Sequence, residues 1–486
     1  MKKNYYVTTS IPYVNGDPHI GFGMELIQAD VLARAARQQG LNVLFSTGTD
    51  EHGTKIAEKA EELGKKVEEF VEEKSGEFRK LCELLNVSND RFIRTTDKGH
   101  EQRSQLIWKA LEKDIYKGKY KGLYDVRQEE FVPESQADPE RLKEDHPQAY
   151  RRLEEDNYFF KLSSYTEQIK HAIESGSFQV YPKKRRNEIL NVLKDGLQDI
   201  SISRPTEKIS WGIPVPGDKS QVMYVWFEAL MNYITVLGYP EHDDFKLFWP
   251  ANVQVIGKDI LRFHAAIWPA MLISLGLPLP KKLYVHGFIN VDNQKMSKSI
   301  GNVVAPKEIV DKYGADAFRY YFLKHISSSD DGDFSWEKFE RAYNTELANE
   351  LGNAVSRVSA MAIKFQEGIM GDIPPSKHDR HEYDQALENC QFDIALQETW
   401  EQIRGLNQYI DEVKPWEIAK EKDDEHLSEV LAQCISDLIE IGELIEPFLP
   451  KTAAEISHIF AKGLVRPSKT SLFPRKDFFT TPKTDA

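Results

Sequence analysis

The start of the chain alternates strand and helix patterns, and this alternation constrains the fold more than any other feature. Tyr5–Ser10 is rich in β-forming residues and predicts a buried strand. Phe22–Gln39 carries apolar residues at helical spacing, and a second strand pattern follows at Asn42–Thr47. Strands that alternate with helices form a parallel sheet, and ligands bind beyond the carboxyl ends of its strands. The sequence therefore predicts an α/β, Rossmann-like domain with its site after these strands.

The turn that follows the first strand is a candidate phosphate site. Gly16, Asp17 and Pro18 end the strand, and His19 and Gly21 come next, at the start of the helix. Unpaired N–H groups and the helix dipole favour an anion at such a helix start. The alternative is an ordinary strand-to-helix connection with a solvated His19. Taken alone, the turn favours this alternative.

Changes of pattern along the chain indicate its domain organisation. Tyr, Gly, Pro and charged residues crowd together after residue 115, which indicates a domain inserted into the α/β domain. The alternating pattern then resumes, and after Trp336 apolar residues recur at helical spacing, which predicts a helical bundle. The predicted segments are 1–115 and 223–305 (the two halves of the α/β domain), 116–222 (insert), 306–335 (linking region), 336–462 (helical bundle) and 463–486 (polar tail).

Charge and cysteine content narrow the class of protein. A formal net charge of −14 argues against a sequence-blind nucleic-acid binder, although a local basic face can still bind RNA. Cys82, Cys390 and Cys434 are widely separated, which predicts buried thiols rather than disulfides or a metal knuckle. We see no secretory signal, and the most apolar stretch, 265–280, is too short and too broken by Pro and Gly to span a membrane. We therefore expect a cytoplasmic protein without a membrane partner.

A second candidate site is the loop Lys295-Met296-Ser297-Lys298-Ser299. A reaction that expels pyrophosphate from ATP builds negative charge on the α-phosphate and the leaving group. Fixed positive charge and positioning are then the main contributions of the protein. Lysines on a loop can close over the phosphates, and the serines can supply neutral hydrogen bonds.

Together these motifs resemble those of class I aminoacyl-tRNA synthetases. His19-Ile20-Gly21-Phe22 resembles the HIGH signature, and Lys295–Ser299 is an intact KMSKS signature. The sequence around these motifs resembles methionyl-tRNA synthetases over nearly the whole chain. The similar segments are SIPYVNGDPHIG (10–21), STGTDEHGTKI (46–56), SRP with WGIPVP (203–216), VMYVWFEALMNY (222–233), HGFIN (286–290), KYGADAFRYYFL (312–323), ELGNAVSR (350–357) and VKPWEIAK (413–420).

The resemblance implies roles for individual residues, position by position. The implied methionine site is Ile11, Tyr13, Asp50, Trp226, Ala229, Leu230, Tyr233 and His264, with Asp50 on the substrate ammonium. The implied ATP site is His19, Gly21, Asp259, Lys295, Ser297 and Lys298, of which His19, Lys295 and Lys298 would be catalytic. Aromatic and aliphatic side chains suit a flexible thioether. The alternative for Trp226 and Tyr233 is plain core packing.

The resemblance also implies the reaction and the partners. Methionine and ATP, which enters with Mg²⁺, would give methionyl-adenylate and pyrophosphate, and the methionyl group would pass to the terminal adenosine of tRNA(Met). The insert would then lie at the acceptor end of the tRNA, residues 306–335 would contact its stem, and the bundle would bind the anticodon. We expect a monomer, because we see no appended C-terminal domain of the kind that some relatives carry.

Three residues of the bundle match the anticodon-reading positions of the family: Asn353, Arg357 and Trp416. Single-stranded loop bases are recognised by stacking on aromatic rings and by hydrogen bonds to their edges. The alternative for Trp416 is an anchor at a helix start beside Pro415, and without the resemblance we would prefer it.

Two features depart from the family pattern. Many relatives carry zinc knuckles in the insert, but here Asp125 and Gln128 stand where cysteines are expected, and 137–158 holds no cysteine pair. A structural zinc needs thiolate or imidazole ligands, so we expect no metal site and no zinc. The other departure is Phe22, in place of the second histidine of the HIGH signature. Phe22 would pack against adenine or fill the core.

Two other functions remain as alternatives. One is a class I ligase for another aliphatic amino acid, because a hydrophobic pocket discriminates a smaller side chain by only about 1–3 kcal/mol. The other is a non-catalytic tRNA-binding relative, which Phe22 prompts. Damage to the lysine loop or to Asp50 would favour it, but both are intact.

Overall fold

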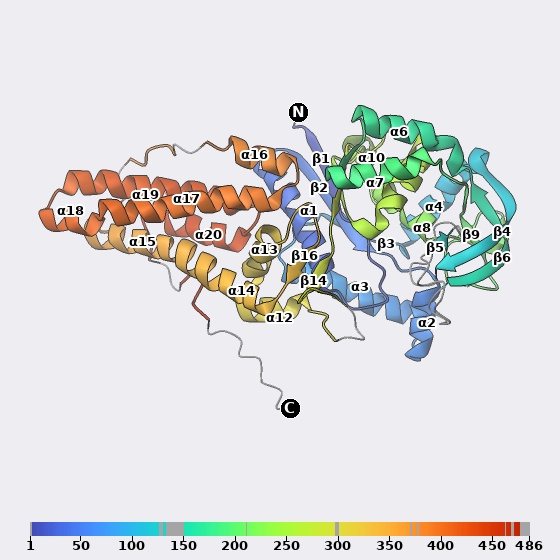
Figure 1. Cartoon of the computed structure of the whole chain (residues 1–486), viewed down its shortest axis with the longest axis horizontal. Helices are drawn as coiled ribbons and strands as arrows, with labels where there is room; N and C mark the ends of the chain where they lie inside the picture. The colour runs from blue at the N-terminus through green and yellow to red at the C-terminus, as the bar shows by residue number, and fades with distance from the viewer. Residues whose placement is uncertain are drawn as a thin grey trace. The chain divides into compact units, whose positions relative to one another are not determined.

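The computed structural model (Figure 1) describes residues 2–125, 130–132, 150–209, 211–296, 301–369, 372–376, 379–461, 463–467 and 471–476. The chain forms two compact units. The first unit comprises Met1–Pro18, Gln39–Lys80 and Asn89–Val285, and the second comprises His19–Gln38, Leu81–Ser88 and His286–Ala486. None of the described helices is both long enough and apolar enough to cross a membrane.

A six-stranded sheet organises the first unit. Its strands, in spatial order, are β3 (Arg91–Arg94), β2 (Asn42–Thr49), β1 (Asn4–Thr8), β12 (Val253–Gly257), β13 (Lys282–His286) and β7 (Gln179–Tyr181). β1 pairs in parallel with β2 and β12, β2 with β3, and β13 with β7. The buried residues of β1 explain this central position, since Tyr6 is enclosed and its hydroxyl lies 3.0 Å from both Ser46 Oγ and the Tyr233 carbonyl oxygen. The predicted α/β fold with a parallel sheet is confirmed.

Helices and short turns complete the first unit. They are α2 (Thr54–Glu62), α3 (Val67–Leu84), α4 (Lys98–Ala110), η1 (Glu112–Asp114), η3 (Leu162–Tyr165), α6 (Thr166–Ser175), α7 (Lys183–Lys194), α8 (Val225–Ala229), α9 (Asn232–Thr235), α10 (Asp243–Phe248), η4 (Lys258–Ile260), the π-helical turn η5 (Phe263–Ile267) and α11 (Trp268–Ser274). The helix pattern over 54–85 is interrupted at Gly64, whose φ of +65° suits glycine. The pattern of this segment also predicts an interruption at Gly76, which is wrong because Gly76 lies inside α3.

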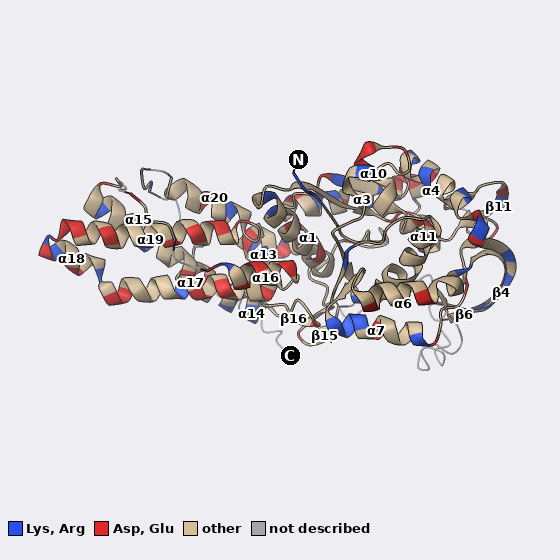
Figure 2. Cartoon of the chain, turned by 90° about the horizontal axis from the view of Figure 1, so that it is seen from above, with Lys and Arg blue, Asp and Glu red and all other residues tan. Residues whose placement is uncertain are grey.

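The insert segment forms two antiparallel sheets. The larger has the order β5 (Glu130–Val132), β4 (Ile115–Asp125), β6 (Tyr150–Phe160) and β8 (Ile200–Ser201); the smaller has β10 (Pro214–Val215), β11 (Asp218–Met223) and β9 (Ser203–Pro205). The Arg204 guanidinium pairs with buried Glu155 at 2.9 and 3.0 Å and lies over the Tyr124 ring. Strand β7, from the same segment, instead forms the edge of the six-stranded sheet. A run of Lys and Arg begins α7 (Figure 2).

The second unit is mostly helical. Its elements are α1 (Ile20–Gln38), β14 (Ile289–Val291), β15 (Gln294–Lys295), α12 (Pro306–Tyr313), α13 (Ala315–Lys324), β16 (Gly332–Phe334), α14 (Trp336–Ala342), the π-helix η6 (Tyr343–Gly352), α15 (Asn353–Gln366), α16 (His381–Glu388), α17 (Phe392–Val413), α18 (Pro415–Glu421), α19 (Asp424–Ile445) and α20 (Pro450–Ile459). Buried Arg319 ties α13 to its neighbours: it pairs with Asp30 at 2.7 Å and donates to the carbonyl oxygens of Pro447 and Phe448. The three cysteines are buried thiols, as predicted.

Candidate active site

A small cavity lies at the carboxyl ends of three neighbouring strands in the first unit. Ser10 and Ile11 follow β1, Asp50 follows β2, and Ile260 follows β12. The helical segment 226–233 and His264 complete the wall. The full lining is Ser10, Ile11, Asp50, Trp226, Ala229, Leu230, Asn232, Tyr233, Ile260 and His264. The sheet therefore brings together seven of the eight residues predicted for an amino acid site. The sequence reasoning missed Ser10, Asn232 and Ile260, although all three directly flank predicted residues.

Aromatic rings form one side of this cavity. The Trp226 indole stacks on Phe263, with ring centroids 4.0 Å apart and planes at 16°. The ring of Tyr13, the eighth predicted residue, meets Trp226 edge-on at 5.8 Å. Phe263 was not predicted. It lies in the π-helical turn η5, and such single-turn features are frequent at functional sites.

A directed hydrogen bond fixes two of the polar groups. His264 Nδ1 lies 2.9 Å from the carbonyl oxygen of Ile260, which can only accept, so Nδ1 carries the proton in the neutral ring. Nε2 is then the acceptor for the Tyr233 hydroxyl, 2.7 Å away. His264 thus orients Tyr233, and the two side chains form a fixed polar pair beside the apolar side chains of the wall.

Asp50 places a carboxylate at the cavity. It is 2% exposed and sits in an isolated parallel bridge with Tyr13, where its N–H donates to the Pro12 carbonyl oxygen at 2.9 Å. The Thr95 hydroxyl donates to Asp50 Oδ1 at 3.4 Å. This backbone pairing fixes the position of the carboxylate against the end of β1.

The candidate phosphate groups meet in the second unit at the start of α1. The Gly21 N–H donates to His19 Nδ1 at 3.1 Å, and the Ile20 N–H donates to the Val304 carbonyl oxygen at 3.3 Å. A Cβ placed on Gly21 would lie 2.9 Å from His19 Cε1 and 3.9 Å from Met296 Cε. The imidazole of His19 and the first part of the lysine loop therefore lie together at a helix N-terminus, which favours anions.

The lysine loop continues from a short hairpin. Lys295 ends β15 opposite Asn290 of β14, and its ammonium lies over the Phe288 ring at 5.5 Å from the centroid. Ser297 and Lys298 lie outside the described residues. In the first unit, Asp259 is exposed in the turn η4, one residue before Ile260 of the cavity.

Comparisons with known proteins show which family the chain belongs to. A family model described as tRNA synthetases class I (M) matches residues 5–144 and 138–359. A methionine–tRNA ligase from Brucella melitensis is 41% identical over 95% of this chain and 92% of its own length. One from Thermotoga maritima is 39% identical over 96% of this chain and 78% of its own length. The chain belongs to the methionyl-tRNA synthetase family.

Solved structures of methionyl-tRNA synthetases match the fold of this chain. A Mycobacterium tuberculosis methionyl-tRNA synthetase in complex with methionyl-adenylate matches with a TM-score of 0.90 at 34% identity, over 97% of this chain and 100% of that one. The apo form of the enzyme from the same organism matches with a TM-score of 0.84 at 32% identity, over 98% and 99% of the two chains. The resemblance found in the sequence motifs is thus confirmed.

The three residues expected at the anticodon of a methionyl-tRNA synthetase lie on two helices of the bundle. Asn353 is exposed at the start of α15, and Arg357 follows one turn later. The Arg357 guanidinium lies over the half-buried Trp416 of α18 at 5.6 Å from the ring centroid, and it pairs with Asp411 at 2.6 Å. The structure thus brings Arg357 and Trp416 into contact.

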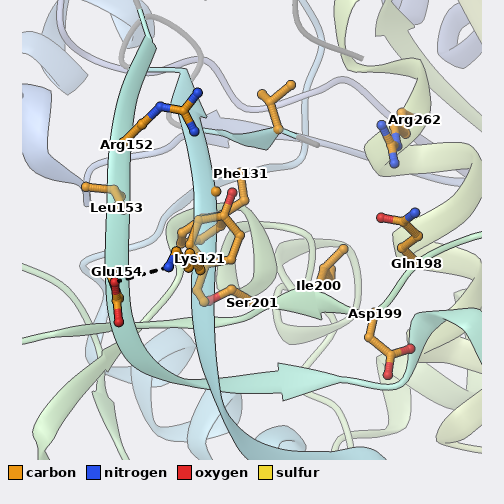
Figure 3. Close-up of a pocket in the computed structure, with 13 residues that line it drawn as sticks. Lys121, Phe131, Arg152, Leu153, Glu154, Gln198, Asp199, Ile200, Ser201 and Arg262 are labelled. Carbon is orange, nitrogen blue, oxygen red and sulfur yellow. Dashed lines mark ion pairs between the residues drawn. The ribbon is translucent and has the colours of Figure 1, made fainter. Parts of the chain in front are cut away.

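A groove of the first unit is lined by residues of β4, β5, β6 and β8 from the insert, by Gln198 and Asp199, and by Arg262 from the α/β domain. Figure 3 shows Arg152 and Arg262 on opposite sides of it, with Phe131 between them. Lys121, also on its wall, pairs with Glu154 at 3.9 Å. Arginine, lysine and aromatic side chains are groups that bind single-stranded nucleic acid, and the carboxylates of Glu154 and Asp199 lie in the same lining. The sequence reasoning did not single out any of these basic residues.

The two departures from the family have different outcomes. Phe22 is 8% exposed within α1. Asp125 is buried at the end of β4, while Gln128 and residues 133–149 lie outside the described residues. In the part of the chain that the structure describes, no three His, Cys, Asp or Glu side chains are grouped as metal ligands. The expected absence of zinc stays a prediction.

Proposed function

We propose that the chain is a methionine–tRNA ligase that works in two steps. The carboxylate of methionine attacks the α-phosphate of ATP, which gives methionyl-adenylate and releases pyrophosphate. A hydroxyl of the terminal adenosine of tRNA(Met) then attacks the carbonyl carbon, which gives methionyl-tRNA and releases AMP. No covalent enzyme intermediate is needed, and Mg²⁺ enters as the complex with ATP.

The cavity of the first unit is the observation that carries this proposal. Asp50 provides one buried carboxylate for the substrate ammonium, and Trp226, Ala229, Leu230 and Ile11 provide an apolar wall for the thioether. Thioether sulfur packs favourably against aromatic rings, and Trp226 with Tyr13 supplies them. The hydrogen-bonded pair of Tyr233 and His264 lies beside these apolar side chains.

We propose that the ATP phosphates bind at the start of α1. His19, Gly21 and Lys295 supply an imidazole, a small residue that lets the phosphate approach, and an ammonium. Ser297 and Lys298 would act from the same loop, and Asp259 would bind the ribose. Positive groups placed where charge develops stabilise the transition state, so His19, Lys295 and Lys298 are the proposed catalytic residues.

We propose two contacts with tRNA. Trp416, Arg357 and Asn353 would read the anticodon by stacking and by hydrogen bonds to base edges. The groove between Arg152 and Arg262 would hold the acceptor end. We further propose a monomer that works in the cytoplasm.

ATP–pyrophosphate exchange over several amino acids tests the proposal. We expect the highest kcat/KM with methionine and a much lower value with leucine, isoleucine and valine. Strongest exchange with another amino acid would instead indicate a ligase for that substrate. Lys295→Ala should reduce exchange at least tenfold, and undiminished exchange would contradict the role proposed for the lysine.

A further inference from the structure

A buried carboxylate between two histidines lies behind the cavity of the first unit. Glu228 of α8 is 0% exposed. Its Oε1 is 2.8 Å from His52 Nδ1, and its Oε2 is 2.8 Å from His100 Nε2. Burial raises the pKa of Glu228, but the charges and hydrogen bonds of His52 and His100 outweigh it and lower the pKa below its ordinary value. An ionised carboxylate only accepts, so both imidazoles donate to Glu228.

Both histidines also have other polar neighbours. His100 Nδ1 lies 2.8 Å from Thr235 Oγ1, and the Ser104 hydroxyl lies 3.3 Å from its Nε2. His52 Nε2 faces Glu101 Oε1 at 4.0 Å. His52, His100 and Thr235 are all buried. Glu228, His52, His100 and Thr235 are therefore joined by buried hydrogen bonds, and such a network holds its members in one geometry.

This set connects three parts of the cavity wall without touching the cavity. His52 follows Asp50 by two residues, Glu228 directly precedes Ala229, and Thr235 follows Tyr233 by two residues. Neither these three residues nor His100 are among the described residues that line the cavity. A shift of Glu228 relative to His52 would change the distance from the Asp50 carboxylate to the wall of α8.

We propose that Glu228 is a positioning residue for the amino acid site. By bridging His52 and His100, it holds the loop that carries Asp50 against the helix that carries Trp226 and Ala229. The ammonium and the thioether of methionine then meet their partners at the same time. This inference rests on the proposed activation of methionine. The lining residues alone do not explain what holds Asp50 and α8 at the right distance, and the Glu228 bridge does.

Three substitutions of Glu228 distinguish a role as a hydrogen-bonded bridge between the histidines from a role as a negative charge alone. Glu228→Gln keeps the length of the side chain, and its amide can accept from one histidine and donate to the other after a change of tautomer. Glu228→Asp keeps the charge but is one methylene too short to reach both rings. Glu228→Ala removes the bridge. Asp114→Asn is the matched control, because Asp114 accepts hydrogen bonds from Tyr165 and Ser274, neither of which lines the cavity.

The measurement is ATP–pyrophosphate exchange with methionine varied and then with ATP varied, together with calorimetric binding of methionine to the full chain. We expect the KM for methionine to rise less than about threefold in Glu228→Gln and about tenfold or more in Glu228→Asp and Glu228→Ala, because small misplacements of binding groups are costly. The KM for ATP should stay within about twofold, and Asp114→Asn should match the wild type.

Three outcomes would overturn the inference. They are an Asp variant closer to the wild type than the Gln variant, an equal rise in the KM for ATP, and an unchanged KM for methionine in Glu228→Ala. Calorimetry with Glu228→Gln and Glu228→Asp decides the question even where Glu228→Ala does not fold. Absence of methionine-dependent exchange in the wild type would instead contradict the proposed function, so the two failures are distinguishable.

Discussion

The guanidinium of Arg357 lies over the indole of Trp416, 5.6 Å from the ring centroid, and the two residues come from different helices of the bundle. A cation above an aromatic face stabilises the ring in one orientation. Arg357 also pairs with Asp411 on α17, so three helices converge on this contact. The arrangement presents a preoriented ring at the surface, which is what stacking on an unpaired base requires.

Trp416→Ala should weaken the use of tRNA without affecting activation of methionine. Loss of one stacked base costs about 1–3 kcal/mol, so we expect the KM for tRNA(Met) to rise about tenfold or more. Aminoacylation with tRNA varied measures this, and ATP–pyrophosphate exchange in the absence of tRNA should stay at the wild-type rate. Lys246→Ala, a change at an exposed lysine of α10 in the first unit, is the control. Equal loss of exchange would show that Trp416 only supports the fold.

Gly21→Ala should impair exchange while leaving the protein stable. The added Cβ would lie 2.9 Å from His19 Cε1 and 3.0 Å from its Nδ1, so the imidazole must move. We expect a fall in kcat/KM for ATP of about tenfold, which corresponds to roughly 1.4 kcal/mol of transition-state stabilisation. Unchanged kcat/KM for ATP would remove the proposed link between Gly21 and His19.

Gly76→Ala is the matched control for this prediction. Gly76 lies inside α3, and a Cβ there meets nothing within 4 Å. Alanine is the better helix former by about 1 kcal/mol, so the free energy of unfolding should rise slightly and exchange should be unchanged.

Tyr233→Phe should weaken the binding of methionine through His264. The substitution removes the hydroxyl that donates to His264 Nε2 at 2.7 Å and leaves a buried acceptor without this partner. An unsatisfied buried group costs about 1–3 kcal/mol, and part of this cost will appear as a higher KM for methionine, by about tenfold. The KM for ATP should not change. Methionine titrations of the exchange rate check both values, and a selective effect on ATP would contradict the placement of Tyr233.

The lowered pKa of Glu346 predicts that the second unit loses stability in acid. Burial raises the pKa of this carboxyl, but His325, Lys324 and Tyr320, which all contact it, outweigh burial and lower the pKa to about 2. The folded pKa lies below the unfolded value, so the unfolded chain binds more protons in acid. The stabilisation is therefore complete above about pH 4.5 and is lost as the pH falls towards 2.

Glu346→Gln should remove this part of the pH dependence. We expect the urea midpoint of the variant, followed by circular dichroism, to change less than that of the wild type between about pH 4.5 and 2. The loss of unfolding free energy over this pH range should be about 2 kcal/mol larger in the wild type than in the variant, after allowance for partial exposure to solvent. Identical pH profiles for the two proteins would contradict the depressed pKa.

The elements that could be predicted from the sequence are those with continuous local patterns. The strand predicted at Asn42–Thr47 is β2, Asn42–Thr49, and the helix predicted at Phe22–Gln39 is α1, Ile20–Gln38. A fully apolar run between breakers is enough to identify a buried strand of a parallel sheet. The edge strand β7 is only three residues long, and its pairing with β13 depends on contacts between distant parts of the chain.

The candidate site divides in the same way. The motifs around His19, Asp50 and Lys295 led to residue types with the right chemistry. Phe263, Ile260 and Glu228 each stand next to a predicted residue, but they were missed because the local sequence does not show which neighbouring side chains the fold brings to the site. The sequence alone also left two roles for Phe22, packing against adenine or filling the core. The burial of its ring in α1 favours the core.

The sequence by itself determined the parallel α/β sheet, the helical bundle, the family and the chemical groups available for the reaction. Only the tertiary structure decided which groups meet: Tyr233 with His264, Arg357 with Trp416, and Glu228 with both His52 and His100. The physical reason is that periodicity reports local burial, which depends on neighbouring residues. The hydrogen bonds of Glu228 join residues 176 and 128 positions apart, so their geometry exists only once the sheet has brought those segments together.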